Sequence, residues 1–252
     1  MEKVAEKNKI LNANHIKLIA IIAMTIDHAS DLIFPGFPIE PVAIGLHLIG
    51  RVTAPIMWFF VCEGFYYTKN IKKYIQRMLL FAVISHFAYC FAFGINPIPL
   101  STGIFNQTSV MWPLFLAVVV LWIQYKAENI KRWQKTLAIT GLILLAFPAD
   151  WSCIAVLAII DMYARRGNLK EQMKSIIVYV VCYAVVSFFF VSKGYALVQI
   201  GVLLIYPILK QYNGQRGKAG WMKWFFYLYY PVHLLLIGLI RMLYFGNVSL
   251  LF

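Results

Sequence analysis

The chain has 252 residues, of which 62% are hydrophobic and 13% are charged. This composition is too apolar for a soluble domain and is typical of an integral membrane protein. The formal net charge of +13 could suit a nucleic-acid-binding protein, but the basic residues gather between apolar runs, which argues against that class.

Nine apolar runs predict an all-α, polytopic membrane helix bundle of about nine transmembrane helices, within a range of eight to ten. They cover residues 16–34, 42–66, 74–93, 109–125, 136–149, 150–164, 175–192, 195–209 and 221–245. The first run is too long for a cleavable signal peptide and is expected to remain as an anchor. The fifth and sixth runs are short, so they form either a hairpin or a broken, re-entrant pair. No repeat or linker divides the chain, and residues 1–252 are predicted to form a single domain.

Lys and Arg gather at the amino end and at alternate connections between the runs, which together hold 20 of the 23 basic residues. By the positive-inside rule the amino terminus is cytoplasmic, nine helices cross the cell inner membrane, and the carboxyl terminus lies outside. The clusters comprise Lys3, Lys7, Lys9 and Lys17; Lys69, Lys72, Lys73 and Arg77; Lys126, Lys131, Arg132 and Lys135; Arg165, Arg166, Lys170 and Lys174; and Lys210, Arg216, Lys218 and Lys223.

Charged residues lie deep in the first run, IKLIAIIAMTIDHASDLIF, as Asp27, His28 and Asp31. Each charge costs roughly 2.5–3.5 kcal/mol at the membrane centre, so such residues usually face a protein interior or a wet cavity. Asp27 and Asp31 are four residues apart and share one helix face, whereas His28 is rotated by about 100°. One interpretation of the carboxylates is a structural ion pair with Arg51 of the second run; the other is an acid–base site.

Three histidines, His28, His86 and His233, each lie eleven or twelve residues from the cytoplasmic start of a predicted helix. At ~1.5 Å per residue this places all three roughly 16–18 Å from the inner face of the membrane, close to the depth of Arg51. We expect them to line one cavity. Tyr230, three residues before His233, can face the same cavity.

Glu63 lies near the cytoplasmic end of the second run, just before Lys69, Lys72 and Lys73. These lysines either receive phosphate groups arriving from the cytoplasm or attract lipid headgroups. The four cysteines lie inside apolar runs without metal-ligand spacing, so we interpret them as packing residues and expect no metal.

Three stretches resemble the TraX family of membrane proteins, which is named for pilin acetylation in conjugal transfer. They are the IDH that contains Asp27-His28, the second-helix run GRVTAPIMWFFVCEGFYYTKNIKKYIQRML, and FFYLYYPVHLLL near the carboxyl end. One departure is SVMWPLF in the fourth run, where the family tends to show Asn and Thr. The resemblance implies transfer of an acetyl group from cytoplasmic acetyl-CoA to a peptide amine, and a relationship to the broader transmembrane acyltransferases with an intramembrane catalytic histidine.

On this hypothesis His28 is the general base, Asp27 orients or charges it, and Arg51 completes the network or stabilises the oxyanion. Residues predicted to contact the substrates are Asp31, Glu63, Lys69, Lys72, Lys73, His86, Tyr230 and His233. The acceptor is an amine or hydroxyl of an exported or membrane molecule, and a covalent acetyl-imidazole on His28 stays open as an alternative.

Two other classes of function stay open. The same buried Asp, His and Arg residues would serve a proton-coupled transporter or channel. A non-catalytic membrane subunit would use them only to assemble with a partner.

Overall fold

The structure is a computed structural model that describes residues 9–35, 38–98, 100–101 and 103–246. Within these residues the chain is all-α without a strand, and two isolated bridges join Leu11 to Tyr212 and Thr108 to Ala149. Every one of the nine predicted apolar runs is helical. Lys3 and Lys7 of the amino-terminal basic cluster lie outside the described residues.

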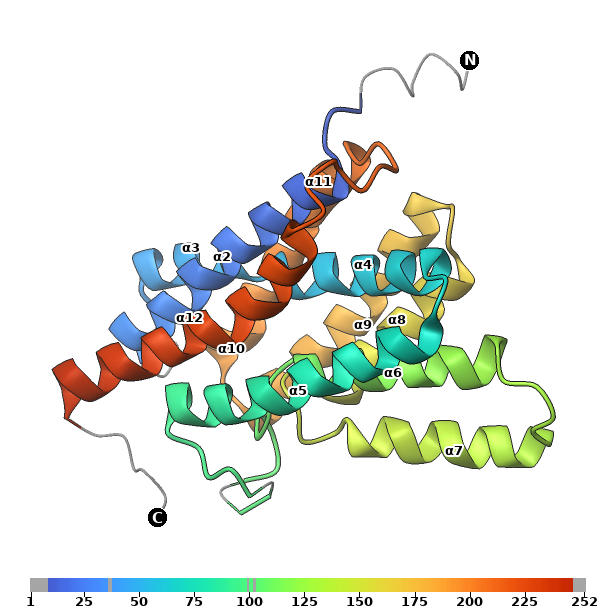
Figure 1. Cartoon of the computed structure of the whole chain (residues 1–252). Coiled ribbons are helices and arrows are strands. Elements are labelled where there is room, and N and C mark those ends of the chain that lie inside the picture. The colour runs from blue at the N-terminus through green and yellow to red at the C-terminus, as the bar shows by residue number, and fades with distance from the viewer. Residues whose placement is uncertain (1–8, 36–37, 99, 102, 247–252) are drawn as a thin grey trace. The chain divides into compact units, whose positions relative to one another are not determined.

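The helices follow one another as Figure 1 shows. They are α2 (Ala13–Ile33), α3 (Pro41–Gly50), α4 (Thr53–Tyr67), α5 (Ile71–Phe93), α6 (Met111–Tyr125), α7 (Arg132–Leu145), α8 (Ser152–Ala164), α9 (Leu169–Phe190), α10 (Lys193–Val198), the 3-10 helix η2 (Gln199–Leu204), α11 (Ile205–Lys210) and α12 (Met222–Phe245).

Side-chain caps make α5 and α9 begin earlier than their apolar runs. The Asn70 side chain accepts a hydrogen bond from the backbone N–H of Lys73 at 3.0 Å, and Asn168 accepts one from that of Glu171 at 3.2 Å. Such caps satisfy backbone donors that have no partner within the helix. As a result Lys72 and Lys73 lie in the first turn of α5 and not in the preceding connection.

The second apolar run is interrupted by a turn at Arg51 and Val52, between α3 and α4. Pro55 has no N–H group and cannot donate to the carbonyl oxygen of Arg51, which accounts for the break at this point. The break places Arg51 at the junction of two helices inside a span of 27 residues, Pro41–Tyr67.

Five helical stretches among the described residues are long and apolar enough to cross a membrane: Pro41–Tyr67, Ile71–Phe93, Leu169–Phe190, Lys193–Lys210 and Met222–Tyr244. Two shorter apolar helices coincide with α6 and α8. Helix α2 has 21 residues but carries Lys17, Asp27 and Asp31. The all-α membrane character is therefore confirmed, whereas the count of nine spans and the cytoplasmic amino terminus stay predictions.

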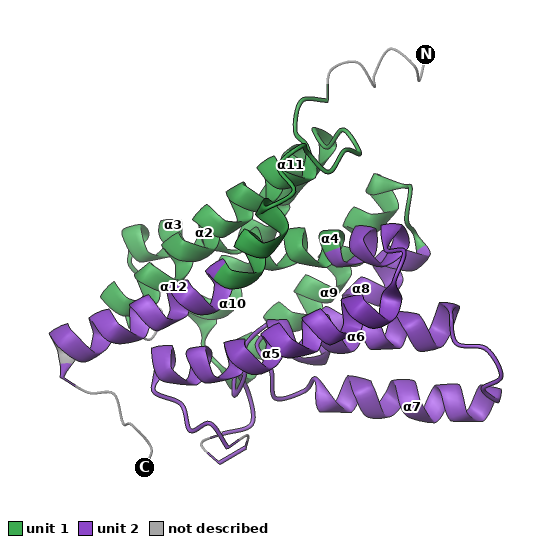
Figure 2. Ribbon diagram, viewed as in Figure 1, with its two compact units in different colours: residues 1–60, 165–228 green, residues 61–164, 229–252 purple. Residues whose placement is uncertain are grey.

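The chain divides into two compact units (Figure 2), and a single domain over residues 1–252 stays a prediction. Unit 1 comprises residues 1–60 and 165–228, and unit 2 comprises residues 61–164 and 229–252. In unit 1, α2 packs on α3, α3 packs on α10 and η2, and α9 packs on α10, η2 and α11. In unit 2, α6 packs on α5, α7 and α8. Large aliphatic and aromatic side chains fill each interior, as burial of apolar surface requires.

Candidate functional site

A buried carboxylate, Asp27, joins two neighbouring helices of unit 1. One of its oxygens accepts a hydrogen bond from Nη2 of Arg51, and the other lies 2.9 Å from Nδ1 of His47. The exposed fractions are 7% for Asp27, 6% for Arg51 and 1% for His47. We call these three residues the Asp27 cluster. Because both charges of the ion pair are removed from solvent, each depends on the other, and loss of either partner would leave an uncompensated buried charge.

Close packing of α2 on α3 brings the cluster together at Gly50. A Cβ atom on Gly50 would lie 2.3 Å from the Cβ of Asp27, so no larger residue fits there without moving the carboxylate. The next residue, Arg51, ends α3, and His47 lies one helical turn earlier on the same face. The Gly50-Arg51 pair in the sequence therefore sets both the distance between the helices and the position of the guanidinium.

The Arg51 guanidinium has further partners from the second half of unit 1. Its Nη1 donates to the hydroxyl of Tyr195 at 3.4 Å, and the guanidinium lies 5.4 Å from the centre of that ring. The Tyr195 hydroxyl is 3.1 Å from the hydroxyl of Tyr183. In the part of the chain that the structure describes, the buried Nε–H of Arg51 has no hydrogen-bond partner. Arg51 thus joins Asp27 to the two tyrosines and keeps one buried donor without a partner among the described residues.

His47 is held through both ring nitrogens. Because Nδ1 lies against a carboxylate oxygen of Asp27, it carries the proton and donates. The other nitrogen, Nε2, can then accept from the Ser30 hydroxyl, which is 3.3 Å away. Asp31 lies slightly further off, with Oδ1 at 3.9 Å from Nε2. Asp27 therefore fixes the tautomer of His47, and Ser30 and Asp31 border its second nitrogen.

His28 follows Asp27 directly on α2 and, unlike His47, is partly exposed. The two residues are close enough to interact electrostatically. The histidine ring that contacts the Asp27 carboxylate at 2.9 Å is, however, that of His47. The structure thus places two imidazoles beside one carboxylate, the first accessible and the second buried.

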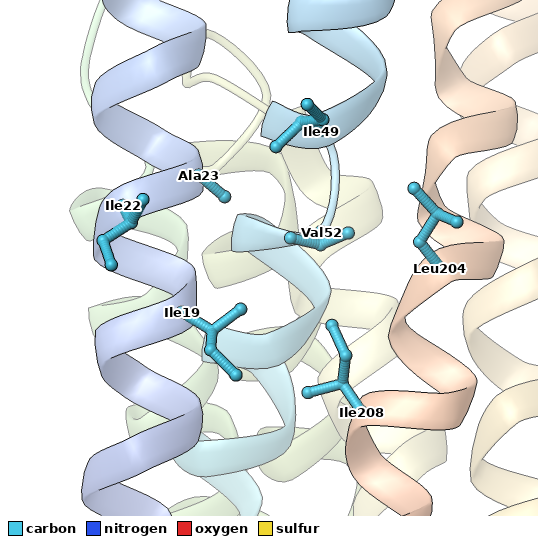
Figure 3. Close-up of a pocket in the computed structure, with 7 residues that line it drawn as sticks. All are labelled: Ile19, Ile22, Ala23, Ile49, Val52, Leu204 and Ile208. Carbon is cyan, nitrogen blue, oxygen red and sulfur yellow. The ribbon is translucent and has the colours of Figure 1, made fainter.

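An aliphatic groove in unit 1 lies beside the cluster (Figure 3), with a cavity volume of about 290 Å³. Ala23 lines it one turn before Asp27 on α2, and Val52 lines it next to Arg51. The remaining lining residues are Ile19, Ile22, Ile49, Leu204 and Ile208. A charged group would be desolvated here without a polar partner, so the groove suits hydrocarbon only.

His86, in α5 of unit 2, fixes the connection to α6. Its Nε2 lies 2.8 Å from the carbonyl oxygen of Pro97, and its Nδ1 lies 2.9 Å from the hydroxyl of Thr108. With one nitrogen donating to the carbonyl and the other accepting from the hydroxyl, the ring joins two ends of one loop. A contact of His86 with substrate stays a prediction.

Tyr230 and His233 come together in α12 of unit 2 and are both buried, at 8% and 5% exposed. Their ring centres are 5.4 Å apart, and the His233 ring also stacks on Tyr229 at 5.4 Å. Nδ1 of His233 donates to the carbonyl oxygen of Tyr229 at 3.0 Å. Since His28 belongs to unit 1, and His86 and His233 to unit 2, a cavity shared by the three histidines stays a prediction.

The lysines that were predicted to receive phosphates or lipid headgroups lie where α4 ends and α5 begins, in unit 2. Lys69, Lys72 and Lys73 are exposed, and Glu63 is buried at 9% exposed. The two helices approach closely at this point. A Cβ on Gly64 would lie only 2.9 Å from the Tyr74 hydroxyl. Exposed lysines are available to a phosphate or to a lipid headgroup, and both interpretations stay open.

Sequence reasoning did not single out His47, Ser30 or Tyr195. His47 has a detectable signal, because it lies four residues before Arg51 in the same apolar run and so shares its helix face. Ser30 and Tyr195 lack such a signal. Tyr195 reaches Arg51 across 144 positions in the sequence, which only the packing of α3 on α10 brings together.

Comparison with known proteins gives consistent results. The family model described as TraX protein matches residues 12–241. The chain is also 29% identical, over 238 residues, to the probable fimbrial assembly protein FimC, serogroup H1, of Dichelobacter nodosus. That match covers 92% of this chain and 96% of the relative. No solved structure matches the chain significantly.

Proposed function

The chain belongs to the TraX family, and from that premise we propose that it is a multi-pass inner-membrane acyltransferase that uses acetyl-CoA. The observation that carries the proposal is the Asp27 cluster together with a partly exposed histidine, His28, on the largely apolar helix α2. A buried carboxylate next to an accessible imidazole supplies a general base, and a buried guanidinium supplies a donor for a developing oxyanion.

His28 is the proposed base because an acceptor has to reach the ring that takes its proton. His47 is 1% exposed and has both nitrogens engaged, so it acts as a positioning residue that holds Asp27. The negative charge of Asp27 stabilises the imidazolium that forms when His28 takes a proton. Asp31, near Nε2 of His47, adds to the same negative field.

In the proposed reaction the nitrogen of an acceptor amine attacks the carbonyl carbon of the acetyl thioester while His28 accepts the proton of the amine. The tetrahedral oxyanion receives a hydrogen bond from Nε–H of Arg51, the donor without a partner among the described residues. When the intermediate collapses, the carbon–sulfur bond breaks, and coenzyme A leaves as a thiol with the proton that His28 returns. A hydroxyl acceptor would follow the same steps.

The donor enters from the side that the basic residues mark as cytoplasmic, where the exposed Lys69, Lys72 and Lys73 attract its phosphates. The acceptor is an exported or membrane molecule. The similarity to a protein named as a probable fimbrial assembly protein supports an exported peptide, with its terminal amine as the recipient.

The proposal is tested with purified protein in lipid vesicles, radiolabelled acetyl-CoA and an extract of envelope peptides. We expect His28→Gln to lose transfer by a factor of about 100 or more, as removal of a general base does. His15→Gln, the same change at an exposed histidine near the start of α2, should transfer at the wild-type rate. Mass spectrometry of the acceptors should show the gain of one acetyl group. Undiminished transfer by His28→Gln would rule out His28 as the base.

A proton-coupled transporter or channel is the second candidate, because buried Asp27, His47 and Arg51 and partly exposed Asp31 form a chain of titratable groups. The two functions predict different responses of the purified protein. Acetyl-CoA should raise the melting temperature of an acyltransferase in detergent, whereas a transporter should instead carry protons across vesicles in response to a pH gradient. Proton flux without acetyl transfer would favour the transporter.

A further inference from the structure

Lys17, in the second turn of α2, is partly buried in unit 1 and packs against aromatic rings. Its Nζ lies 4.9 Å from the ring centre of Phe60 and 5.5 Å from that of Phe226. A lysine near the end of a membrane helix normally extends its ammonium group into water or among lipid headgroups. Here the ammonium is instead held inside the unit by the faces of two rings.

The loop before α12 brings a second cation, Arg216, near Lys17. The backbone N–H of Leu11 donates to the carbonyl of Gln211 at 3.0 Å, and that of Ala13 donates to Gln215 at 2.8 Å. The loop therefore runs along the start of α2, and the charge of Arg216 acts on Lys17.

The loop also lies against a buried amide. Gly217 has φ +92°, which favours glycine, and a Cβ there would lie 2.7 Å from Nδ2 of Asn14. The Asn14 side chain, at 6% exposed, is thus next to the residue that follows Arg216.

Lys17 is partly buried and Arg216 is exposed, and the repulsion between their like charges would be relieved by an anion. The segments that build this part of unit 1, residues 9–26, 53–60 and 199–228, contain no Asp or Glu. Asp27, the next carboxylate along α2, is ten residues from Lys17, roughly 15 Å along the helix. A bound anion would balance these two cations.

We infer that Lys17, Arg216 and the amide of Asn14 form a binding site for an organic phosphate. Lysine offers a compact charge, arginine a planar pair of donors and asparagine an N–H group, and all three groups suit phosphate oxygens. The phosphate belongs either to the nucleotide part of the acyl donor or to the headgroup of an anionic lipid. The first source rests on the proposed acyltransferase function.

The position of the site fits a donor whose thioester lies at a distance from its phosphates. Lys17 and His28 are eleven residues apart, which is about three full helical turns. Their directions around the helix axis therefore differ by only about 20°. Both side chains therefore point from the same face of α2, roughly 16 Å apart along its axis. A nucleotide thioester with its phosphates at Lys17 would extend its arm along this face toward His28.

The test measures binding to the detergent-purified full chain by calorimetry, with coenzyme A, pantetheine (which lacks phosphate) and a short-chain phosphatidylglycerol as probes. We expect Lys17→Gln and Arg216→Gln each to weaken coenzyme A binding about tenfold or more, as loss of a charged hydrogen bond does. Lys17→Arg should retain most of the affinity. Lys218→Gln, which removes the same charge from an exposed residue of the same loop, should bind like the wild type, and pantetheine should bind weakly to every variant.

The outcomes separate the two sources and the two proposals. If phosphatidylglycerol, and not coenzyme A, depends on Lys17 and Arg216, the phosphate site holds and the ligand is a lipid. If coenzyme A depends on them while acetyl transfer survives in His28→Gln, the site holds and the base assignment fails. If neither phosphate probe binds more weakly to Lys17→Gln and Arg216→Gln than to Lys218→Gln, the inference is overturned.

Discussion

Gly50 of α3 lies directly against Asp27 of α2, so closely that a Cβ on the glycine would stand 2.3 Å from the aspartate Cβ. The same contact brings His47 and Arg51, which flank Gly50 on α3, to the two oxygens of the Asp27 carboxylate. The geometry of the candidate site therefore depends on the absence of one side chain.

Gly50→Ala should consequently separate α2 from α3 and weaken both contacts of Asp27. Overpacking of this kind costs about 1–3 kcal/mol, which thermal unfolding in detergent would detect as a lower melting temperature. Gly45→Ala is the matched control, because it lies on the same helix and its added Cβ would meet nothing within 4 Å. Equal melting temperatures for the two variants would contradict the close contact.

The ion pair between Asp27 and Arg51 should show strong coupling in a double-mutant cycle. Asp27→Asn or Arg51→Gln alone leaves one buried charge without a partner and should cost about 3–5 kcal/mol. The double variant should cost clearly less than the sum, because both charges are gone. Glu171→Gln, at an exposed pair with Lys174, should change stability far less than either buried variant. Additive losses at Asp27 and Arg51 would show that the two side chains do not interact.

His47 should act on transfer through Asp27 and not by contact with the substrate. Asn at this position can place an N–H group near that of the ring Nδ1, so His47→Asn should retain more stability and more acetyl transfer than His47→Ala. Both variants should leave the Michaelis constant for acetyl-CoA near its wild-type value. A positioning role would be refuted if His47→Asn lost transfer as completely as His28→Gln while remaining equally stable.

The sequence predicts the helices well but their partners poorly. All nine apolar runs are helical, because length and hydropathy depend on neighbouring residues only. The starts of α5 and α9 differ from the predicted runs because a polar cap, Asn70 or Asn168, extends each helix beyond its apolar part. Hydropathy does not register such caps.

The sequence identifies only part of the candidate site. Asp27, His28 and Arg51 stand out because charge inside an apolar run is visible without a structure. The contact of Asp27 with His47 depends on the register of α2 against α3, which Gly50 sets and which no spacing along the chain reveals. Tyr195 reaches Arg51 only through the packing of α10 on α3.

The His86 ring joins Pro97 and Thr108 at the two ends of a loop in unit 2. His86→Phe keeps the size of an aromatic ring but removes both hydrogen bonds, each of which contributes about 0.5–1.5 kcal/mol. The loop should then open more often, and proteinase K should cut between these two residues faster than in the wild type.

The same substitution at the exposed His15 of α2 controls for a general effect of phenylalanine. His86→Gln, which can form one of the two bonds, should be cut at an intermediate rate. Because the ring belongs to unit 2 and the Asp27 cluster to unit 1, acetyl transfer by His86→Phe should fall less than that by His28→Gln. If His86→Phe abolished transfer with no change in cleavage, the ring would serve the substrate and not the loop.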